Sequence, residues 1–247
     1  MYTSFAENYD LLMQDVDYKK RTEYLLSLFK KYSKKPTLML DLACGTGSFS
    51  NEFAKSGIQV IGVDISPEML NIAREKSEKE KLDVLYLCQD ASELDLYGTV
   101  DGAVCCMDSI NHITDKQVLS EVFKKVSLFL EPQCLFVFDV NTLYKHKEIL
   151  ANNTFIIEEG NIYCVWQNEF FKDEALTEIT LDFFKREKDN IYNRCEQFIE
   201  ERAYTVKELT DLLQNAGFSV EAIFDDMSFE PLKATSERAV FIAKKVF

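Results

Sequence analysis

An acid stands four positions before a pair of glycines early in the chain, where Asp41 is followed by Gly45 and Gly47. The apolar run 38–40 before the acid favours a strand buried on both faces, and a helix-compatible stretch follows the glycines. Glycines permit backbone angles and close approaches that a Cβ would block. Free N–H groups at the start of a helix favour a negatively charged ligand group. The segment predicts either a strand–turn–helix cradle for a ligand or a plain tight turn.

A second acid, Asp64, ends the next apolar run, residues 58–64. A carboxylate in this place suits a ribose, because it can accept hydrogen bonds from both vicinal hydroxyls. The following residues open a helix, with Ser66 as its cap, Pro67 at the first helical position and Glu68 in the first turn. The acid after this second buried strand therefore favours a ligand that contains a ribose.

The first segment, acidic-x-Ala-x-Gly-x-Gly at 41–47, resembles the first motif of class I S-adenosylmethionine-dependent methyltransferases, and residues 63–70 closely resemble the second. A dinucleotide fingerprint has a third glycine where this chain has Ser50. The resemblance implies S-adenosylmethionine as cofactor, with Asp41 facing its ammonium and Asp64 its ribose. The other cofactor contacts that it implies in these two motifs are Ala43, Cys44, Gly45, Gly47, Ile65 and Met69.

Two later segments extend the resemblance. It implies that Asp90 and Ala91, after a third short strand, lie beside the adenine, and that Met107, at the end of a fourth strand, also touches it. Ligands of open parallel sheets bind beyond the carboxyl ends of the strands, so the residues after Met107 should face the transferable methyl group. We therefore take His112 as a candidate general base and Asp108 as a candidate catalytic or ammonium-binding residue. Each can also serve only as a cap or a packing residue.

Further candidates lie outside these motifs. In small-molecule methyltransferases that the chain resembles, a Tyr-Asp-bearing stretch covers the cofactor, so Tyr9 and Tyr18 are candidate lid residues that contact it. They can equally pack a helix onto the core. His146 is a weaker candidate than His112, because its neighbours Tyr144, Lys145 and Lys147 indicate a solvated segment.

The order of elements predicts an α/β fold with a Rossmann-like, mostly parallel seven-stranded sheet, helices on both faces and a small inserted antiparallel β subdomain. Residues 151–204 lose helical periodicity, and alternation over 176–184 is typical of a half-buried strand. A capping box at 205–208 restores the helical pattern, and two strands end the chain. We expect a methyltransferase core of residues 1–150 plus 205–247, with 151–204 as substrate roof, oligomer interface or both.

The composition and net charge disfavour several classes of binding partner. A net charge of −14 disfavours a large nucleic-acid surface. No apolar run approaches the ~20 residues needed to cross a bilayer, and the first residues lack the pattern of a signal peptide. The seven scattered cysteines show no metal-ligand spacing and no disulfide framework. We expect a cytoplasmic protein that needs no metal and does not bind a membrane; a homodimer is an open alternative to a monomer.

The function that follows is transfer of a methyl group from S-adenosylmethionine to a nitrogen or oxygen of a small-molecule acceptor. A methyltransferase acting on RNA or protein is the first alternative, disfavoured because we find no Asn-Pro-Pro-Tyr motif and no basic face. A non-catalytic module that binds the cofactor is the second. A nicotinamide-dependent oxidoreductase conflicts with Ser50 and with the terminal pair of strands.

Overall fold

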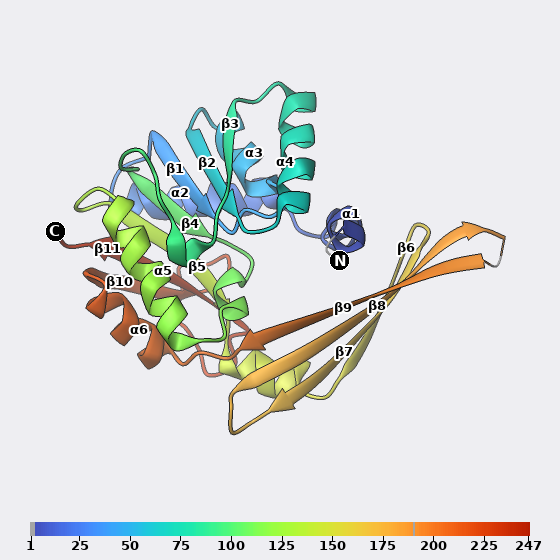
Figure 1. Ribbon diagram of the computed structural model, residues 1–247. Helices are drawn as coiled ribbons and strands as arrows, with labels where there is room; N and C mark the ends of the chain where they lie inside the picture. The colour runs from blue at the N-terminus through green and yellow to red at the C-terminus, as the bar shows by residue number, and fades with distance from the viewer. Residues whose placement is uncertain (1–2, 190) are drawn as a thin grey trace.

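A computed structural model describes residues 3–189 and 191–247 and contains two separate sheets (Figure 1). The larger sheet has seven strands in the order β10-β11-β5-β4-β1-β2-β3. Neighbours from β5 to β3 run parallel, whereas β11 is antiparallel to both β5 and β10. The predicted mostly parallel seven-stranded sheet is confirmed. Its strands are β1 (Leu38–Leu42), β2 (Gln59–Asp64), β3 (Val84–Cys88), β4 (Gly102–Cys105), β5 (Leu135–Asn141), β10 (Phe218–Asp225) and β11 (Arg238–Lys245).

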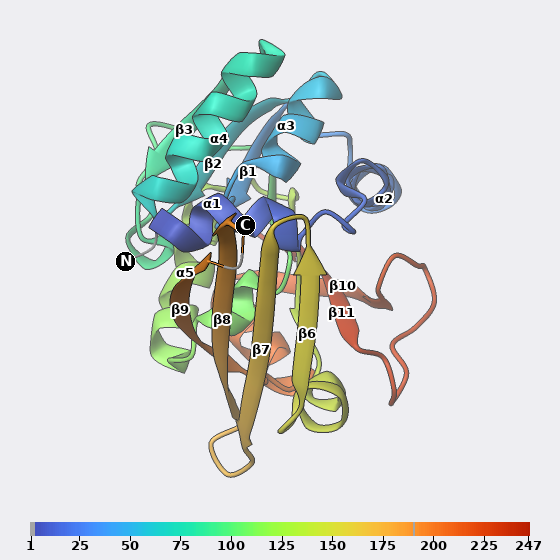
Figure 2. The same ribbon diagram turned by 90° about the vertical axis from the view of Figure 1, so that its right-hand side faces the viewer.

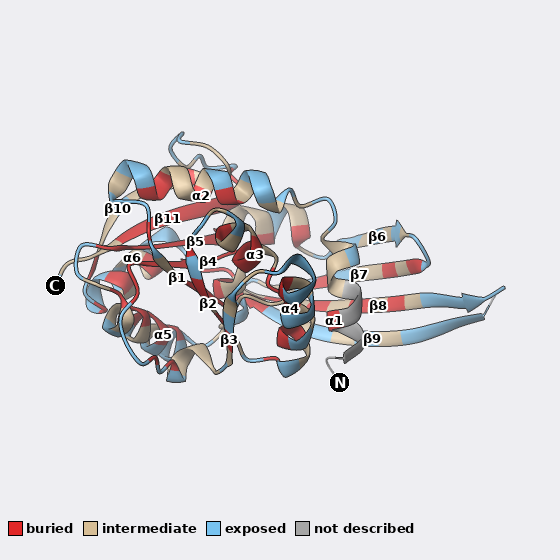
Figure 3. Cartoon of the chain, turned by 90° about the horizontal axis from the view of Figure 1, so that it is seen from above, coloured by how far each residue is buried: buried red, intermediate tan, exposed pale blue. Residues whose placement is uncertain are grey.

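Helices cover both faces of this sheet, as predicted (Figure 3). One face packs against α2 and α3 through a core that includes Phe29 and Phe53, and the other packs against α5 and α6 through Phe123 and Leu213. The α-helices are α1 (Thr3–Leu12), α2 (Tyr18–Tyr32), α3 (Ser48–Lys55), α4 (Pro67–Glu80), α5 (Lys116–Phe129) and α6 (Val206–Asn215). Shorter helical turns are η1 (Ala91–Glu93), η2 (Ser109–His112) and η3 (Lys145–Leu150).

The helix starts follow the predicted capping chemistry. Ser66 Oγ accepts a hydrogen bond from the backbone of Met69 at 3.2 Å and starts α4. The capping box of Thr205 and Glu208 starts α6. Each cap satisfies N–H groups that have no partner inside the helix, which fixes where the helix begins. No helix in the described part of the chain is long and apolar enough to cross a membrane.

The smaller sheet is antiparallel, in the order β6-β7-β8-β9, and extends away from the larger one with α1 beside it (Figures 1 and 2). The predicted alternation is confirmed, since Ile179, Leu181 and Phe183 are all buried on one face. The register pairs Thr177 with Glu201 at the end of the sheet that approaches η2. Its strands are β6 (Thr154–Glu159), β7 (Ile162–Phe171), β8 (Leu176–Lys188) and β9 (Ile191–Arg202).

Candidate active site

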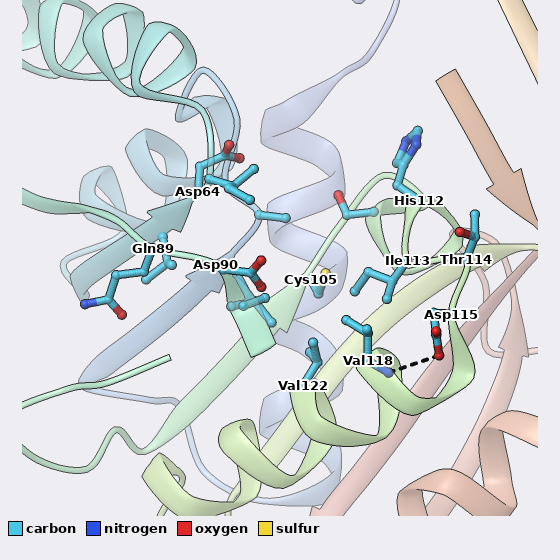
Figure 4. Close-up of a pocket in the computed structure, with 16 residues that line it drawn as sticks. Asp64, Gln89, Asp90, Cys105, His112, Ile113, Thr114, Asp115, Val118 and Val122 are labelled. Carbon is cyan, nitrogen blue, oxygen red and sulfur yellow. Dashed lines mark hydrogen bonds between the residues drawn. The ribbon is translucent and has the colours of Figure 1, made fainter. Parts of the chain in front are cut away.

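A cavity of about 390 Å³ opens beyond the carboxyl ends of β1, β2, β3 and β4 (Figure 4). Asp64 and Asp90 lie on one side of it, and Val118 and Val122 of α5 lie opposite. An apolar slot between aliphatic side chains and two carboxylates suits a flat heterocycle joined to a sugar. The predicted cofactor residues Ala43, Asp64, Ile65, Asp90 and Ala91 all line this cavity.

Asp64 is fixed by two backbone groups on either side of it. Its Oδ2 accepts from the N–H of Gly45 at 2.7 Å, and its Oδ1 accepts from Ser66 at 2.9 Å. Burial raises the pKa of this carboxyl. Each carboxylate oxygen has a further lone pair, so the side chain can still accept from two hydroxyl groups. The arrangement fits the predicted ribose contact and ties the glycine loop to β2.

One carboxylate oxygen of Asp90 accepts hydrogen bonds within the protein, and the other can accept from a ligand. Its Oδ1 accepts from the backbone and hydroxyl of Ser92, at 2.8 and 2.7 Å, and so caps η1. Among the described residues no donor is recorded at Oδ2, so this oxygen can accept from an exocyclic amine. Ala91 follows directly along the cavity wall.

A second cavity, of about 40 Å³, adjoins the first through Ala43 and Ser109, which line both. Ala43 and Gly45 take left-handed backbone conformations, with φ of 55° and 53°. Such angles bend the loop sharply after β1, and Gly45 adopts them without the steric cost of a side chain. Predicted residues that line this second cavity are Tyr9, Tyr18, Asp41, Ala43, Cys44, Gly45 and Met107.

Asp41 is almost completely buried beneath this loop. Its Oδ2 accepts from the hydroxyl of Ser50 at 2.5 Å. Burial, which outweighs this hydrogen bond, raises the pKa of Asp41 to about 7. Ser50 marked the absence of a third glycine in the sequence, and its role as donor to the carboxylate was not predicted.

Two predicted cofactor residues line neither cavity. A Cβ on Gly47, whose φ is +72°, would lie 2.4 Å from the hydroxyl of Tyr86. This glycine therefore lets the start of α3 pack closely onto β3. The side chain of Met69 is buried in the core, and its N–H is bonded to Ser66. Gly47 and Met69 are therefore closely packed, and their contact with the cofactor stays a prediction.

The lid candidates lie over the smaller cavity. Asp10 of α1 accepts from Thr46 Oγ1 at 2.6 Å and from Lys76 Nζ at 2.8 Å, which ties α1 to the glycine loop and to α4. Burial raises the pKa of Tyr9 above its usual range and that of Tyr18 to about 12. Both phenols therefore stay protonated at neutral pH and can donate hydrogen bonds.

The loop after β4 is held in an uncommon conformation. Met107 and Asp108 have φ of 57° and 53°, a left-handed conformation that costs free energy in residues with a side chain. Asp139 accepts from both of their N–H groups, at 2.9 and 3.0 Å. One carboxylate at the end of β5 therefore fixes the turn that presents Asp108.

Arg238, at the start of β11, links these acids. Its guanidinium lies 2.7 Å from Asp108 and also bonds Asp139. Burial disfavours the ionised form of Asp108, but the charge of Arg238 outweighs it and lowers the pKa to about 2. Asp108 is therefore a carboxylate at neutral pH. Sequence reasoning missed Arg238, because nothing local to this residue indicates partners so distant along the chain.

Four more polar residues complete this cluster. His112 Nε2 lies 4.0 Å from Glu201 Oε1, and His146 Nε2 lies 3.7 Å from Glu201 Oε2. Asn141 Nδ2 donates to Asp108 at 3.0 Å and to Glu201 at 3.2 Å. The inference that the His146 segment is solvated is wrong for the histidine itself. Its imidazole is fully buried and bonds Thr177 of β8 at 2.7 Å, while its neighbour Lys147 is exposed.

The pair predicted to act in catalysis is brought together. Asp108, His112 and Glu201 each present an atom within 4.8 Å of the others. In Figure 4 the imidazole of His112 projects from the rim of the larger cavity, away from Val122 and Cys105 on its floor. Glu201 was not predicted, because only its burial at the end of β9 distinguishes it from the acids beside it in sequence.

Comparisons with known proteins show which family this chain resembles. A methyltransferase domain model matches residues 39–133. The protein named "Putative methyltransferase YqeM" of Bacillus subtilis is 32% identical, covering 99% of this chain and 97% of its own. A crystal structure of an S-adenosylmethionine-dependent methyltransferase from Clostridium acetobutylicum has a TM-score of 0.89 at 31% identity, covering 100% of this chain and 99% of that chain. CalS10, an amino pentose methyltransferase from Micromonospora echinaspora solved with S-adenosylmethionine bound, shares the fold at 16% identity, with a TM-score of 0.78 and coverage of 100% and 98%.

The acceptor groups and the apolar residues that line the two cavities fit this cofactor. The apolar slot with Asp64 and Asp90 matches an adenosine, and the adjoining cavity with Asp41 matches a short chain that carries an ammonium. The chain belongs to the class I S-adenosylmethionine-dependent methyltransferases, and it is an enzyme with S-adenosylmethionine as its cofactor.

Proposed function

We propose that the enzyme transfers a methyl group to a nitrogen or oxygen of a small-molecule acceptor, with Asp108 and His112 in the acceptor site. The single observation that carries the proposal is the juxtaposition of the two cavities with Asp108, His112 and Glu201. Ser109 lines both cavities, and His112 lines the larger one. An acceptor held by this trio would therefore face the place where the two cavities meet.

Each part of the chain has a distinct task in this proposal. The bound cofactor supplies a methyl group on a positively charged sulfur, so the reaction is an in-line displacement. Tyr9 and Tyr18 exclude water above it, and the strand ends hold it in line with the acceptor. His112 accepts the proton that the acceptor loses. Its side chain is 42% exposed, so the imidazole can pass the proton on to water.

The proposed division of the chain follows the two sheets. Residues 1–150 with 205–247 bind the cofactor, and residues 151–204 contribute to acceptor recognition through the end of β9. A cytoplasmic enzyme is part of the proposal, supported by seven cysteines that are all free thiols in the structure. A homodimer remains a prediction.

Incubation with S-adenosylmethionine that carries a labelled methyl group, together with a panel of small amines, phenols and carboxylic acids, tests the function. We expect label in a product of the panel, and we expect His112→Gln to lower the rate roughly a hundredfold at unchanged cofactor affinity. Cofactor binding without transfer to any member would favour a non-catalytic module. Label in added RNA or protein alone would favour the macromolecular alternative.

A further inference from the structure

Glu201 is a buried carboxyl group whose ion-pair contacts, among the described residues, are the imidazoles of His112 and His146 and no Lys or Arg side chain. It is 4% exposed, at the end of β9. Within the described ranges, its Oε2 accepts one hydrogen bond, from the amide of Asn141 at 3.2 Å, and its Oε1 accepts none. Burial and the negative charge of Asp108 raise the pKa of Glu201, because an ionised carboxylate is costly to bury unless a cation and hydrogen bonds replace the water. In a site next to the cofactor, the missing partner points to a ligand.

The nearby Arg and Lys side chains do not contact Glu201. Arg238 pairs with Asp108 and Asp139. Lys145 Nζ donates to the amide oxygen of Asn141 at 3.0 Å and makes no ion pair with Glu201. Burial lowers the pKa of His146 to about 4, so this imidazole is neutral. His112 is the remaining group, and its Nε2 is 4.0 Å away, too far for a hydrogen bond.

We infer that Glu201 receives the ammonium group of the acceptor, which makes the acceptor an amine. The inference rests on the proposed function and names its substrate class. An ammonium carries one positive charge and three N–H donors. Glu201 Oε1 and His112 Nε2 can each accept one of these donors, and Asp108 adds negative charge within 4.8 Å.

Two other occupants fit less well. A hydroxyl group brings no charge and a single donor, so it would leave the carboxylate of Glu201 uncompensated. A divalent metal ion would need the oxygens of Asp108, which already accept from Arg238 at 2.7 Å and from Asn141 at 3.0 Å. The fixed charge of Arg238 beside them also repels a dication. An ammonium needs neither of those oxygens as a ligand.

The same geometry supplies the proton path. The ammonium gives one proton to His112 Nε2, and the freed nitrogen lone pair forms the new N–C bond. The C–S bond breaks with its electron pair left on sulfur, which becomes a neutral thioether. The acceptor ends as a methylated ammonium, so charge and electrons balance without an oxidant or a reductant. Glu201 then stabilises the product charge as it stabilised that of the substrate.

Matched acceptor pairs test the substrate class. The full-length protein would be assayed with benzylamine and benzyl alcohol, 2-phenylethylamine and 2-phenylethanol, and cyclohexylamine and cyclohexanol. Binding to the protein saturated with S-adenosylhomocysteine would be measured for the same compounds. We expect the amine of a pair to bind more tightly than its alcohol and to be methylated. An alcohol that binds or reacts as well as its amine, or no amine preference in any pair, overturns the inference.

Glu201→Gln keeps the shape of the side chain and removes its charge. We expect kcat/KM for the amine, or its affinity where turnover is slow, to fall on the order of 10- to 100-fold, with the affinity for S-adenosylmethionine unchanged. Glu200→Gln is the matched control, because this neighbour on β9 is exposed. Unchanged amine recognition in Glu201→Gln contradicts the role. Failure of the proposed function is distinguishable, since it would appear as absent methyl transfer despite intact, Glu201-dependent amine binding.

Discussion

The cofactor half that we propose, around Asp41 and Asp64, and the acceptor half that we propose, around Asp108 and Glu201, are held together by contacts of different sequence separation. In the cofactor half, Asp41 bonds Ser50, nine positions away, and Asp64 bonds Gly45, 19 positions away. In the acceptor half, Asn141 bonds Glu201 across 60 positions, and Asp139 bonds Arg238 across 99. The first half is a set of consecutive strand–loop units, whereas the second forms only when β5, β9 and β11 are all in place.

Because of this difference, we expect substitutions in the two halves to have different effects. A change in the cofactor half breaks contacts within one strand–loop unit, so it should mainly weaken cofactor binding. A change in the acceptor half removes a link between the two sheets or between β5 and β11, so it should affect stability and catalysis together. The predictions below test that separation, in order of decreasing effect.

Removal of Arg238 should have the largest effect. Arg238→Met leaves Asp108 and Asp139 without their cationic partner in a buried site. We expect the free energy of unfolding to fall by about 3–5 kcal/mol, with loss of methyl transfer even where the variant is folded. Urea unfolding and labelled-methyl transfer measure the two effects.

The control is Arg194→Met on the smaller sheet. Arg194 pairs with Asp182 and Glu196, but its side chain is 54% exposed, so the expected loss is below about 1 kcal/mol. If both arginine variants lose a similar small amount of stability, the acceptor half is not the structural link described here.

Removal of the Asp64 carboxylate should lower the affinity for the cofactor. Asp64→Ala removes a carboxylate that can accept from two ribose hydroxyls, at about 1.5–3 kcal/mol for each hydrogen bond to a charged group before allowance for water. We therefore expect calorimetry with S-adenosylhomocysteine to show a loss of roughly a hundredfold or more in affinity. Asp95→Ala, at an exposed acid just outside the cavity, should bind normally. Unchanged affinity in a folded Asp64→Ala protein would refute the ribose contact.

The sequence separation of these contacts also explains which parts of the fold and site could be predicted from the sequence. The glycine pair, the capped helix at Ser66 and the acids Asp64 and Asp90 are short-range signals, because each functional residue lies directly after a strand whose apolar run is visible. That regularity predicted the fold, and most of the predicted cofactor residues line one of the two cavities. The contact of Met69 with the cofactor rests on the motif resemblance alone and stays a prediction.

The acceptor half offered no comparable signal. Glu201 stands among Glu196 and Glu200, and only the register of β9 against β8 and the approach of η2 decide which of them is buried. Arg238 precedes an ordinary buried strand, and its partners lie on β5 and after β4. Such residues are identified by contacts between distant segments, which a single sequence does not contain.

The buried His146 should limit stability in acid. Its folded-state pKa of about 4 lies below the usual value of 6.5. The unfolded chain therefore binds a proton first as the pH falls, and stability is lost below about pH 6.5. Between about pH 7.5 and about pH 5 this group should remove about 2 kcal/mol from the free energy of unfolding.

His146→Gln tests this contribution. The quantity to compare is how steeply the free energy of unfolding changes with pH in the wild type and in the variant. Urea unfolding of both proteins across the same pH range cancels the other titrating groups. We expect the variant to be less stable at neutral pH but to lose about 2 kcal/mol less on acidification. Parallel pH profiles would mean that His146 is protonated in the folded protein, contrary to its burial.

The titration of Asp41 should have the smallest effect, a change with pH in the affinity of the cofactor half for its ligand. Its pKa of about 7 means that the buried carboxyl is half protonated at neutral pH. The raised value also means that ionisation lowers stability as the pH rises from about 4 to about 7, and an ammonium from the cofactor would relieve this cost. The affinity for S-adenosylhomocysteine should therefore rise about fivefold between pH 6 and 7, before the ligand's own amine loses its proton.

Asp41→Asn, which can still accept from Ser50, should bind with an affinity that is flat across that range. Calorimetric titration of both proteins in matched buffers gives the two profiles. An equally steep rise in the variant would assign the titration to another group and leave the ammonium without its predicted partner. A rise seen only in the wild type would show that the cofactor half compensates its buried charge with its ligand, as we propose that the acceptor half does through Glu201.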